Sequence, residues 1–156
     1  MHVIEYRTTG FTEIDVIRPL WQQLNAHHHA KASRFRERYE QMTFEDRRSH
    51  FRRCLESGDL RIDLALDKET GRFIGYCVSS LSREKNGEIE SLFVETGYRM
   101  QGIGTALVNR ALGWMDGCGA ERKRVAVGEG NEKSFAFYEK FGFFPRMTVL
   151  EQKKQA

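Results

Sequence analysis

The sequence has little of several features that mark particular protein classes. Its 156 residues include only two prolines and three cysteines. The cysteines, Cys54, Cys77 and Cys118, are odd in number, lie far apart and form no CxxC pair, so we expect neither a disulfide framework nor a cysteine-based zinc site. Such cysteine usage is typical of the reducing cytoplasm, which is therefore the expected location.

Long hydrophobic runs and a strong charge of one sign are also missing. No apolar run approaches the roughly 18–20 residues of a membrane span, and the N-terminal residues do not form a signal peptide. The formal net charge of +3, from 25 basic and 22 acidic side chains, is too small to indicate a nucleic-acid-binding protein. We therefore expect neither a membrane nor a nucleic acid as a partner.

What is present is typical of a globular protein. The length is about that of one domain, and the sequence shows no internal repeat or linker, so we predict a single domain over residues 1–156. Hydrophobic residues make up 40% and charged residues 30%, which excludes a disordered chain. A chain of this size can bury a core without disulfides or a structural metal.

The hydrophobic periodicity changes along the chain and predicts a mixed α/β fold. Apolar residues at helical spacing indicate helices around 14–24, 44–57, 102–117 and 131–141. Alternation and turn residues indicate strands at 2–8, 60–67, 72–81, 87–95, 122–128 and 143–152. Residues 60–95 have the pattern of an antiparallel meander. The expected fold class is therefore α/β, a mixed and mostly antiparallel sheet flanked by about four helices.

Residues suited to helix starts support three of these helices. Thr43 followed by Asp46 resembles a capping box, in which each residue bonds the backbone of the other. Asn131 can cap the last helix through its side chain. Pro19 is compatible with the first helix only if it lies in the first turn.

The most informative segment joins the strand at 87–95 to the helix at 102–117, where residues 98–105 are YRMQGIGT. Gly102 and Gly104 leave the backbone bare, so a ligand can approach closely. The first turn of a helix has unpaired N–H groups and the positive end of the dipole, which favour phosphate. The alternative is a turn that simply needs small residues.

Two common phosphate motifs do not fit this chain. The dinucleotide fingerprint needs a third glycine where Leu107 stands. A Walker loop needs a glycine where Glu132 precedes Lys133 and Ser134.

A third pattern, Arg/Gln-x-x-Gly-x-Gly/Ala, does fit, through Arg99, Gly102 and Gly104. Further along, Asn131 and Tyr138, with the FGF at 141–143, match N-x(6)-Y-E-x-x-G-F. The two motifs at this distance resemble the GNAT superfamily of N-acetyltransferases, which bind acetyl-CoA. The predicted order of strands and helices is similar to the GNAT fold from end to end.

The resemblance implies a binding site for acetyl-CoA as cosubstrate. Backbone N–H groups of residues 100–105 would face the pyrophosphate, and Arg99 would add positive charge. The backbone at 92–94 would pair with the pantetheine arm and offer an N–H to the thioester oxygen. The implied cofactor-binding residues are Leu92, Phe93, Val94, Arg99, Met100, Gln101, Gly102, Ile103, Gly104, Thr105, Asn131 and Tyr138.

The resemblance also implies direct attack of an amine on the thioester, with no metal and no covalent enzyme intermediate. Tyr138 stands where the family's general acid usually stands, although it could equally be a core tyrosine. Glu88 and Glu90 alternate on one strand face, and either could be the base. Both could instead be substrate-binding or surface carboxylates. Ala126 on the next strand argues against a glutamate base there.

In this family the first helices wall the acceptor site, so Trp21, His28 and Glu90 are candidate substrate-binding residues. Residues 31–53 form a basic segment, which could favour an acidic acceptor, although the common interpretation of such a segment is a set of solvated helix faces. The adjacent histidines at 27–29 cannot all face one side of a helix, so they do not predict a metal site.

The expected function is an acetyl-CoA-dependent N-acetyltransferase whose acceptor is a small-molecule or peptide amine. Two alternatives remain open: an acyl-CoA sensor with the same fold and no catalysis, and a nucleic-acid-binding protein that uses the basic segment at 31–53. Homodimers are common among proteins that resemble this one.

Overall fold

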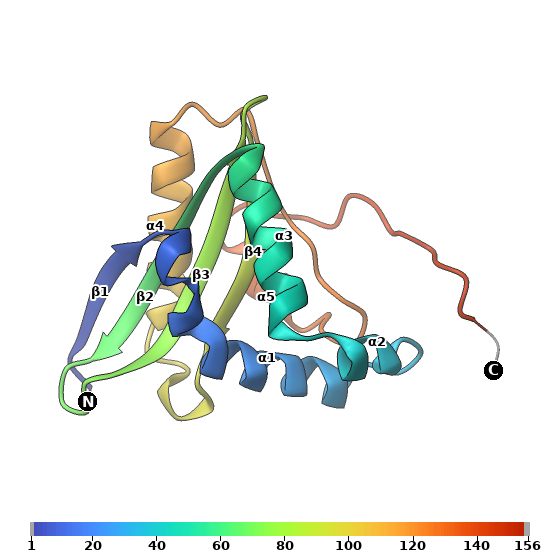
Figure 1. Cartoon of the computed structure of the whole chain (residues 1–156), viewed down its shortest axis with the longest axis horizontal. Coiled ribbons are helices and arrows are strands. Elements are labelled where there is room, and N and C mark those ends of the chain that lie inside the picture. Colours follow the sequence, from blue (N-terminus) through green and yellow to red (C-terminus); the bar gives the residue numbers. More distant parts are fainter. Residues whose placement is uncertain (1, 155–156) are drawn as a thin grey trace.

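The computed structural model describes residues 2–154 and has a five-stranded sheet at its centre (Figure 1). The strands are β1 (Ile4–Thr9), β2 (Gly58–Asp67), β3 (Arg72–Ser82), β4 (Asn86–Val94) and β5 (Arg122–Val125). They lie side by side in chain order. Strands β1 to β4 are antiparallel to their neighbours, and β5 runs parallel to β4. The predicted mixed, mostly antiparallel sheet is confirmed.

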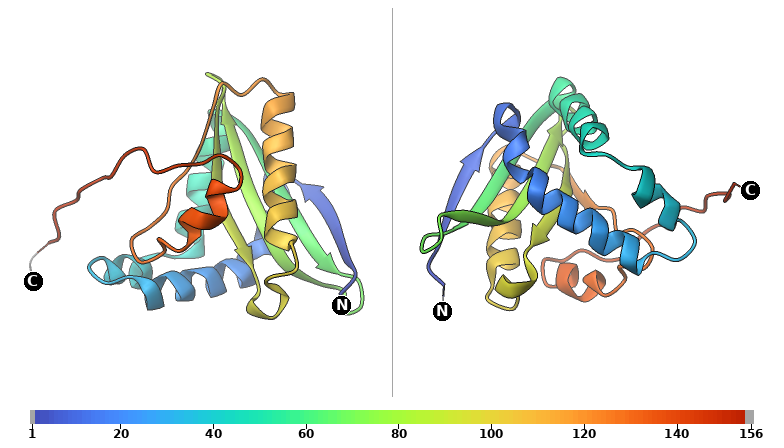
Figure 2. Two further views of the ribbon diagram at one scale, coloured as in Figure 1. Left: turned by 180° about the vertical axis from the view of Figure 1, so that it is seen from behind. Right: turned by 60° about the horizontal axis from the view of Figure 1, so that its bottom comes forward.

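Helices cover both faces of this sheet. The α-helices are α1 (Arg18–Lys31), α2 (Arg36–Gln41), α3 (Phe44–Glu56), α4 (Ile103–Gly117) and α5 (Ser134–Glu139), and two 3-10 segments are η1 (Phe11–Ile17) and η2 (Thr96–Tyr98). Figures 1 and 2 show α1 and α3 on one face and α4 and α5 on the other. The sequence pattern did not predict α2, because none of its residues is buried.

An apolar cluster on each face fixes the helices to the sheet. Helix α3 buries Phe51 completely against β2 and β3, and a fully buried phenylalanine contributes about 1.5–3 kcal/mol. Helix α4 places Leu107, Ala111 and Met115 against the opposite face at helical spacing. Because α4 connects β4 to the parallel β5, this packing also sets the position of the helix start relative to β4.

The helix starts agree in part with the expectations. Pro19 lies in the first turn of α1, where its missing N–H costs nothing. The predicted capping box of α3 is confirmed: the Asp46 N–H donates to Thr43 Oγ1 at 3.1 Å, and the Thr43 N–H donates to Asp46 Oδ2 at 2.9 Å. The predicted Asn131 cap is wrong, because α5 begins after Lys133 and the Asn131 carbonyl, not its side chain, accepts from Ser134.

The predicted final strand at 143–152 is also wrong. Residues 144–154, here called the C-terminal arm, are extended but pair with no strand in the described part of the chain. Figures 1 and 2 show the arm leaving the body of the molecule beyond α5. Alternating residues define a strand only when a neighbour supplies hydrogen bonds, and the free edge of β5 does not meet the arm.

None of the helices formed by residues 2–154 combines the length and the apolar character that crossing a membrane requires.

Candidate active site

The site is built on the point where β4 parts from β5. The two strands pair only from Asn86 with Arg122 to Ile89 with Val125. Beyond that point, residues 90–94 of β4 keep β3 as a neighbour but have no partner on the β5 side. The family resemblance implied this separation, and the resulting backbone edge is free to pair with an extended ligand.

A β-bulge at Glu90 marks the same place. Opposite β3, Val78 pairs with Ser91 and Ser79 pairs with Ile89, so Glu90 is the extra residue on β4. A bulge bends its strand and redirects a side chain. Here it brings Glu90 to the face covered by α3.

The loop after β4 opens the N-terminus of α4. Gly102 is the N-cap, with a left-handed φ of 79°, and no side chain caps the helix. The first helical bond runs from the Ala106 N–H to the Gly102 carbonyl at 3.0 Å. The N–H groups of Ile103, Gly104 and Thr105 therefore have no intrahelical acceptor, which makes this helix start suited to an anion.

A buried hydrogen bond holds the beginning of this loop. The Tyr98 hydroxyl donates to Asp67 Oδ2 at 2.6 Å, and both residues are buried. This bond, opposed by burial, holds the pKa of Asp67 below its usual value. The sequence did not point to this pair, because Asp67 ends β2, Tyr98 lies in η2 and no local motif joins them.

A cavity of about 550 Å³ lies between the free end of β4, the start of α4 and α5. All but one of the predicted cofactor-binding residues line it, the exception being Gln101. The other lining residues are Leu24, His27, Tyr98, Ser134, Phe137 and Lys140. Phe137 of α5 packs over the start of α4, where a Cβ on Gly104 would stand in van der Waals contact with its ring, at 3.4 Å.

Arg99 does not extend freely into solvent. Its Nε donates to the Val94 carbonyl at 3.0 Å, and its guanidinium lies 5.5 Å from the centre of the Phe93 ring. It therefore places positive charge beside the parted end of β4 as well as near the start of α4.

Tyr138 lies in the cavity wall among aromatic rings. Its ring centre is 5.1 Å from that of Phe137 and 6.1 Å from that of Phe143. Burial raises the pKa of the Tyr138 phenol above its ordinary value, so the hydroxyl keeps its proton at neutral pH. Tyr138 lines the cavity, and a protonated phenol can donate to an anion that develops there.

The two candidate bases have different partners. Arg124 Nε on β5 donates to Glu88 Oε1 at 2.7 Å. Glu90 accepts from Ser80 Oγ at 2.7 Å, and its Oε1 lies 2.8 Å from His50 Nε2. Burial works to raise the pKa of Glu90, but the bonds to His50 and Ser80 outweigh it and hold this pKa below its usual value.

Two residues beside Glu90 were missed by the sequence argument. His50 and Cys54 stand four apart on one face of α3, a spacing that the sequence does display. Cys54 Sγ lies 3.6 Å from His50 Nε2 and 3.6 Å from Glu90 Oε2. Burial and the Glu90 carboxylate raise the pKa of the Cys54 thiol to about 11.

The candidate acceptor residues do not all reach a cavity. Trp21 is buried in the core, with its ring edge against Phe44. His28 stacks 5.4 Å from Tyr39 and, with burial as the main cause, has a lowered pKa. It is His27, not His28, that lines the 550 Å³ cavity.

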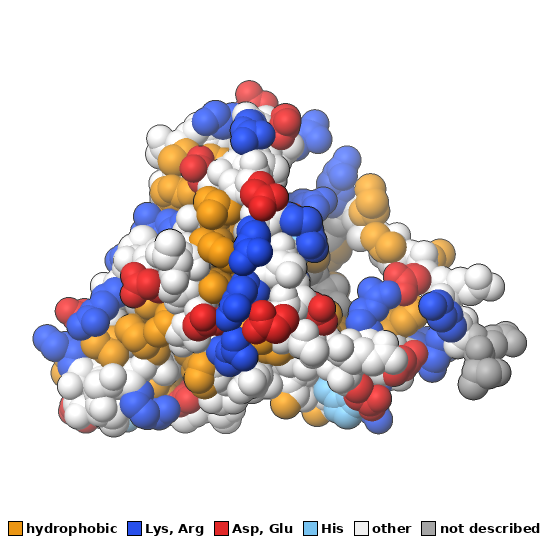
Figure 3. Space-filling view, viewed as in Figure 1, with side chains coloured by type: hydrophobic (Ala, Val, Ile, Leu, Met, Phe, Trp, Pro, Cys, Tyr) orange, Lys and Arg blue, Asp and Glu red, His pale blue; other side chains and the backbone are white. Residues whose placement is uncertain are grey.

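Half of the eight basic side chains in the segment at 31–53 have hydrogen-bond or ion-pair partners. Arg48 bonds Glu45 and Asp15, Arg38 bonds Glu151, and Arg47 donates to the Glu90 carbonyl. In Figure 3, basic and acidic side chains alternate on this face of the molecule. The interpretation as solvated, ion-paired helix faces is therefore favoured over a nucleic-acid surface.

Glu129 and Gly130 anchor the loop between β5 and α5 to a distant part of the chain. Glu129 accepts from the Phe35 N–H at 2.6 Å and from Ser33 Oγ at 3.1 Å. Gly130 has a φ of 86°, and a Cβ there would lie 2.1 Å from the Lys31 carbonyl oxygen. These contacts fix the loop against the segment that joins α1 to α2.

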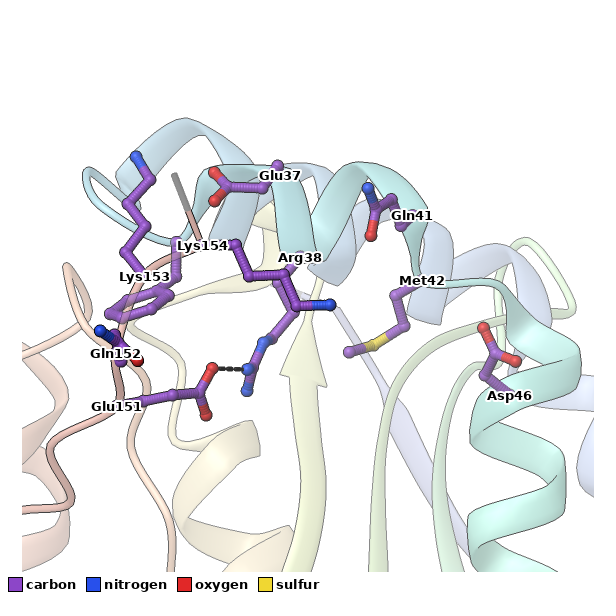
Figure 4. A pocket seen from close by; sticks show the side chains of 10 residues that line it. Glu37, Arg38, Gln41, Met42, Asp46, Glu151, Gln152, Lys153 and Lys154 are labelled. Atoms are coloured by element: carbon purple, nitrogen blue, oxygen red, sulfur yellow. Dashed lines mark hydrogen bonds and ion pairs between the residues drawn. The ribbon is translucent and has the colours of Figure 1, made fainter. Parts of the chain in front are cut away.

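A second cavity, of about 880 Å³, lies between α2, the start of α3 and the C-terminal arm (Figure 4). Arg38 on α2 and Glu151 on the arm meet across it. Its other lining residues are Phe35, Glu37, Gln41, Met42, Asp46, Gln152, Lys153 and Lys154. Both signs of charge are present, so its lining does not by itself select one class of ligand.

Several curated proteins are similar to part of the chain. An uncharacterized N-acetyltransferase of Methanocaldococcus jannaschii is 33% identical over 72 residues, which cover 46% of this chain and 32% of that protein. An uncharacterized N-acetyltransferase of Mycobacterium bovis is 28% identical over 85 residues, which cover 54% of this chain and 54% of that protein. The match thus spans about half, or less, of the length of these relatives.

Solved structures resemble the chain over nearly its whole length. The aminoglycoside N-acetyltransferase AAC(6')-Iy, in complex with CoA, has a TM-score of 0.70 at 17% identity and covers 100% of this chain and 97% of its own. The PaiA N-acetyltransferase from Thermoplasma acidophilum, in complex with coenzyme A, has a TM-score of 0.72 at 20% identity. The likeness covers 94% of this chain and 93% of that protein. At these identities the likeness shows the fold.

A family model that matches most of the chain identifies the family. The model of the acetyltransferase (GNAT) family matches residues 21–143, which is more than half of the chain. The match runs from α1 through the parted strands and the Gly102 loop to the end of the Tyr138 motif, and it stops where the C-terminal arm begins. The chain belongs to the acetyltransferase (GNAT) family.

Proposed function

We propose that the protein transfers the acetyl group of acetyl-CoA directly to a primary amine of a small molecule or peptide. The observation that carries this proposal is the cavity between the parted end of β4 and the uncapped start of α4, with Tyr138 in its wall. Family membership and the CoA complexes of AAC(6')-Iy and PaiA support it.

The cavity has the features that the two ends of acetyl-CoA require. The free N–H groups at the start of α4 suit the pyrophosphate, and Arg99 adds charge. The backbone edge of Leu92, Phe93 and Val94 on the β5 side has no strand partner and suits the amide-bearing pantetheine arm, and Asn131 lines the same cavity. The N–H near Phe93 or Val94 is the proposed donor to the thioester oxygen.

Tyr138 is the proposed general acid. The amine nitrogen attacks the carbonyl carbon, the N–C bond forms and the C–S bond breaks. The Tyr138 hydroxyl gives its proton to the leaving sulfur, and the proton lost from the new amide nitrogen restores the phenol through solvent. The raised pKa of Tyr138 keeps the acid in its working, protonated form.

Glu90 is the proposed base that deprotonates the acceptor ammonium. Its carboxylate side chain is 7% exposed, whereas that of His50, bound to it, is 37% exposed. The proton can therefore pass from Glu90 through the imidazole to solvent. Glu88 is the less favoured candidate, because its carboxylate is bound by the Arg124 guanidinium.

The proposed acceptor binds on the side of α1 and α2. Amines carry positive charge before deprotonation, and Glu90 lies on this side of the sheet beneath α3.

Thermal unfolding with acetyl-CoA, CoA and NAD tests the binding part of the proposal. A bound ligand at a hundredfold excess over its Kd stabilises by about 2.7 kcal/mol, which is about 5–10 °C for a chain of this size. We expect both CoA species to raise the midpoint and NAD to leave it unchanged. Absence of a shift with either CoA species would contradict the proposal.

Release of free CoA thiol with an amine panel tests the transfer part. The panel contains aminoglycosides, polyamines, amino acids and peptides with a free N-terminus. Turnover with one class identifies the acceptor. Binding of acetyl-CoA without turnover on any amine would instead identify a non-catalytic acyl-CoA sensor.

A further inference from the structure

Three side chains outside the cofactor cavity bring a nitrogen, a sulfur and an oxygen donor together. They are His50 and Cys54 of α3 and Glu90 of β4, and their donor atoms all lie within 4.8 Å of one another. Imidazole, thiolate and carboxylate are the three donor types that protein zinc sites use. No metal was expected from the sequence, because the family resemblance implies none and neither a CxxC pair nor the adjacent histidines at 27–29 indicate one.

The distances within this triad are close to those of tetrahedral coordination. With metal bonds of about 2.3 Å to sulfur and about 2.0–2.2 Å to nitrogen and oxygen, a tetrahedral site needs about 3.6 Å between sulfur and each lighter donor. Cys54 Sγ lies 3.6 Å from His50 Nε2 and 3.6 Å from Glu90 Oε2. The 2.8 Å from His50 Nε2 is measured to the other oxygen, Oε1, so the carboxylate has to rotate until a single oxygen lies about 3.4 Å from Nε2.

The surroundings hold the donors in place and leave one side open. Ser80 Oγ donates to Glu90 Oε2 at 2.7 Å, which orients the carboxylate as outer partners of metal ligands do. Phe51, between the two α3 donors in the sequence, is fully buried and fixes the rotation of the helix. The His50 side chain is 37% exposed, so the triad is reached from solvent on that side.

Two arginines lie near the triad, and neither forms an ion pair with the Glu90 carboxylate. The Arg47 guanidinium donates to the neutral main-chain carbonyl of Glu90 at 3.1 Å. The Arg124 guanidinium is bound by Glu88. Among the described residues the Glu90 carboxylate itself forms an ion pair only with His50, so no guanidinium competes directly for its oxygens.

We propose that His50, Cys54 and Glu90 form a binding site for one thiophilic divalent cation, represented by Zn²⁺, with a fourth position open to water. On binding, the Cys54 S–H bond breaks, a metal–sulfur bond forms and the proton goes to solvent, while the neutral imidazole and the carboxylate each supply a lone pair. No electron is transferred.

Metal binding would also affect catalysis. This consequence rests on the proposed function, whereas the binding of the cation does not. A metal-bound Glu90 carboxylate is no longer available to accept a proton. Zn²⁺ therefore inhibits acetyl transfer at concentrations that fill the site, and a chelator reverses the inhibition.

Cobalt substitution in the full chain tests the binding. Co²⁺ is added to chelator-treated protein, and the thiolate-to-cobalt charge-transfer absorption in the near ultraviolet is titrated. We expect one equivalent per chain in the wild type and in Cys118→Ser, which removes an exposed cysteine elsewhere. The band disappears in Cys54→Ser, and Co²⁺ affinity falls at least tenfold in His50→Asn.

Circular dichroism and thermal unfolding confirm that each variant is folded. The proposal is overturned if the wild type shows no band, or if Cys54→Ser retains it. Inhibition is measured as the ratio of rates with and without Zn²⁺ for the wild type and Cys54→Ser. Cobalt binding without zinc inhibition overturns the inhibitory consequence, and absence of transfer on every amine sinks the proposed function while the metal result stands.

Discussion

The chemistry of this protein depends on a few residues whose surroundings, more than their identities, set their roles. Tyr138 and Tyr6 are both partly buried tyrosines packed against the α4 face of the sheet, and burial raises the pKa of both. Only Tyr138 lines the cavity proposed for acetyl-CoA. Glu88 and Glu90 are likewise neighbours on one strand, but one is bound by a guanidinium and the other by an imidazole.

Replacement of Tyr138 with Phe removes the proposed acid while keeping the ring. We expect kcat to fall by a factor of about 10²–10⁴, the usual contribution of general acid catalysis. The affinity for acetyl-CoA should change less than twofold, because the aromatic contacts with Phe137 and Phe143 remain. Steady-state kinetics on an accepted amine and a thermal shift with acetyl-CoA measure the two quantities. The matched control is Tyr6→Phe, and equal kinetics for both variants would show that Tyr138 is not the acid.

Both the backbone conformation at position 130 and the atoms packed around it require glycine. Its φ is 86°, and an added Cβ would lie 2.1 Å from the Lys31 carbonyl oxygen. Gly130→Ala should therefore lower the free energy of unfolding by more than the roughly 1–2 kcal/mol of the left-handed conformation alone. Gly113→Ala, in an exposed part of α4 with open space around it, should be neutral or stabilise by up to about 1 kcal/mol. Urea unfolding of both variants gives the comparison, and equal stabilities would contradict the clash.

At the scale of elements, the features predicted correctly from the sequence are those that depend on residues close together in the chain. The capping box of α3 is local, and Thr43 and Asp46 meet as expected. The parted β4 and the Gly102 helix start followed from a motif. Contacts between distant elements could not be predicted this way. The Tyr98–Asp67 bond and the triad of His50, Cys54 and Glu90 depend on strand register and on a bulge that no local pattern encodes.

Thr43→Ala tests how much the cap contributes to α3. The variant loses the Thr43 Oγ1 acceptor for the Asp46 N–H. We expect the free energy of unfolding to fall by about 1 kcal/mol, within the 0.5–2 kcal/mol typical of an N-cap threonine. Ser49→Ala, on an exposed position of the same helix, should cost nothing because alanine has the higher helix propensity. Urea titrations provide both values, and an unchanged stability in Thr43→Ala would contradict the cap's contribution.

At the scale of the whole molecule, the C-terminal arm is the part that the sheet leaves unpaired. Four of the exposed large apolar residues, Phe144, Met147, Val149 and Leu150, lie on it, and Leu150 is 91% exposed. Within residues 2–154, β5 is a sheet edge with β4 as its one neighbour. The sequence predicted a strand over 143–152 from these apolar residues. That prediction was wrong within one chain because strand formation needs a partner as well as a pattern.

An open edge and an exposed apolar arm on one molecule are complementary to those of a second copy. We therefore expect the full chain to form a homodimer in which the arm covers apolar surface of its partner. Light scattering coupled to size-exclusion chromatography should show twice the chain mass for the full chain and a single chain mass after removal of residues 144–156. Val149→Asp should weaken the dimer at least tenfold, because it places a charge in the apolar contact. Lys153→Gln on the same arm should leave it unchanged. A monomeric full chain at micromolar concentration, or a truncated chain that still dimerises, would show that the arm does not join two copies.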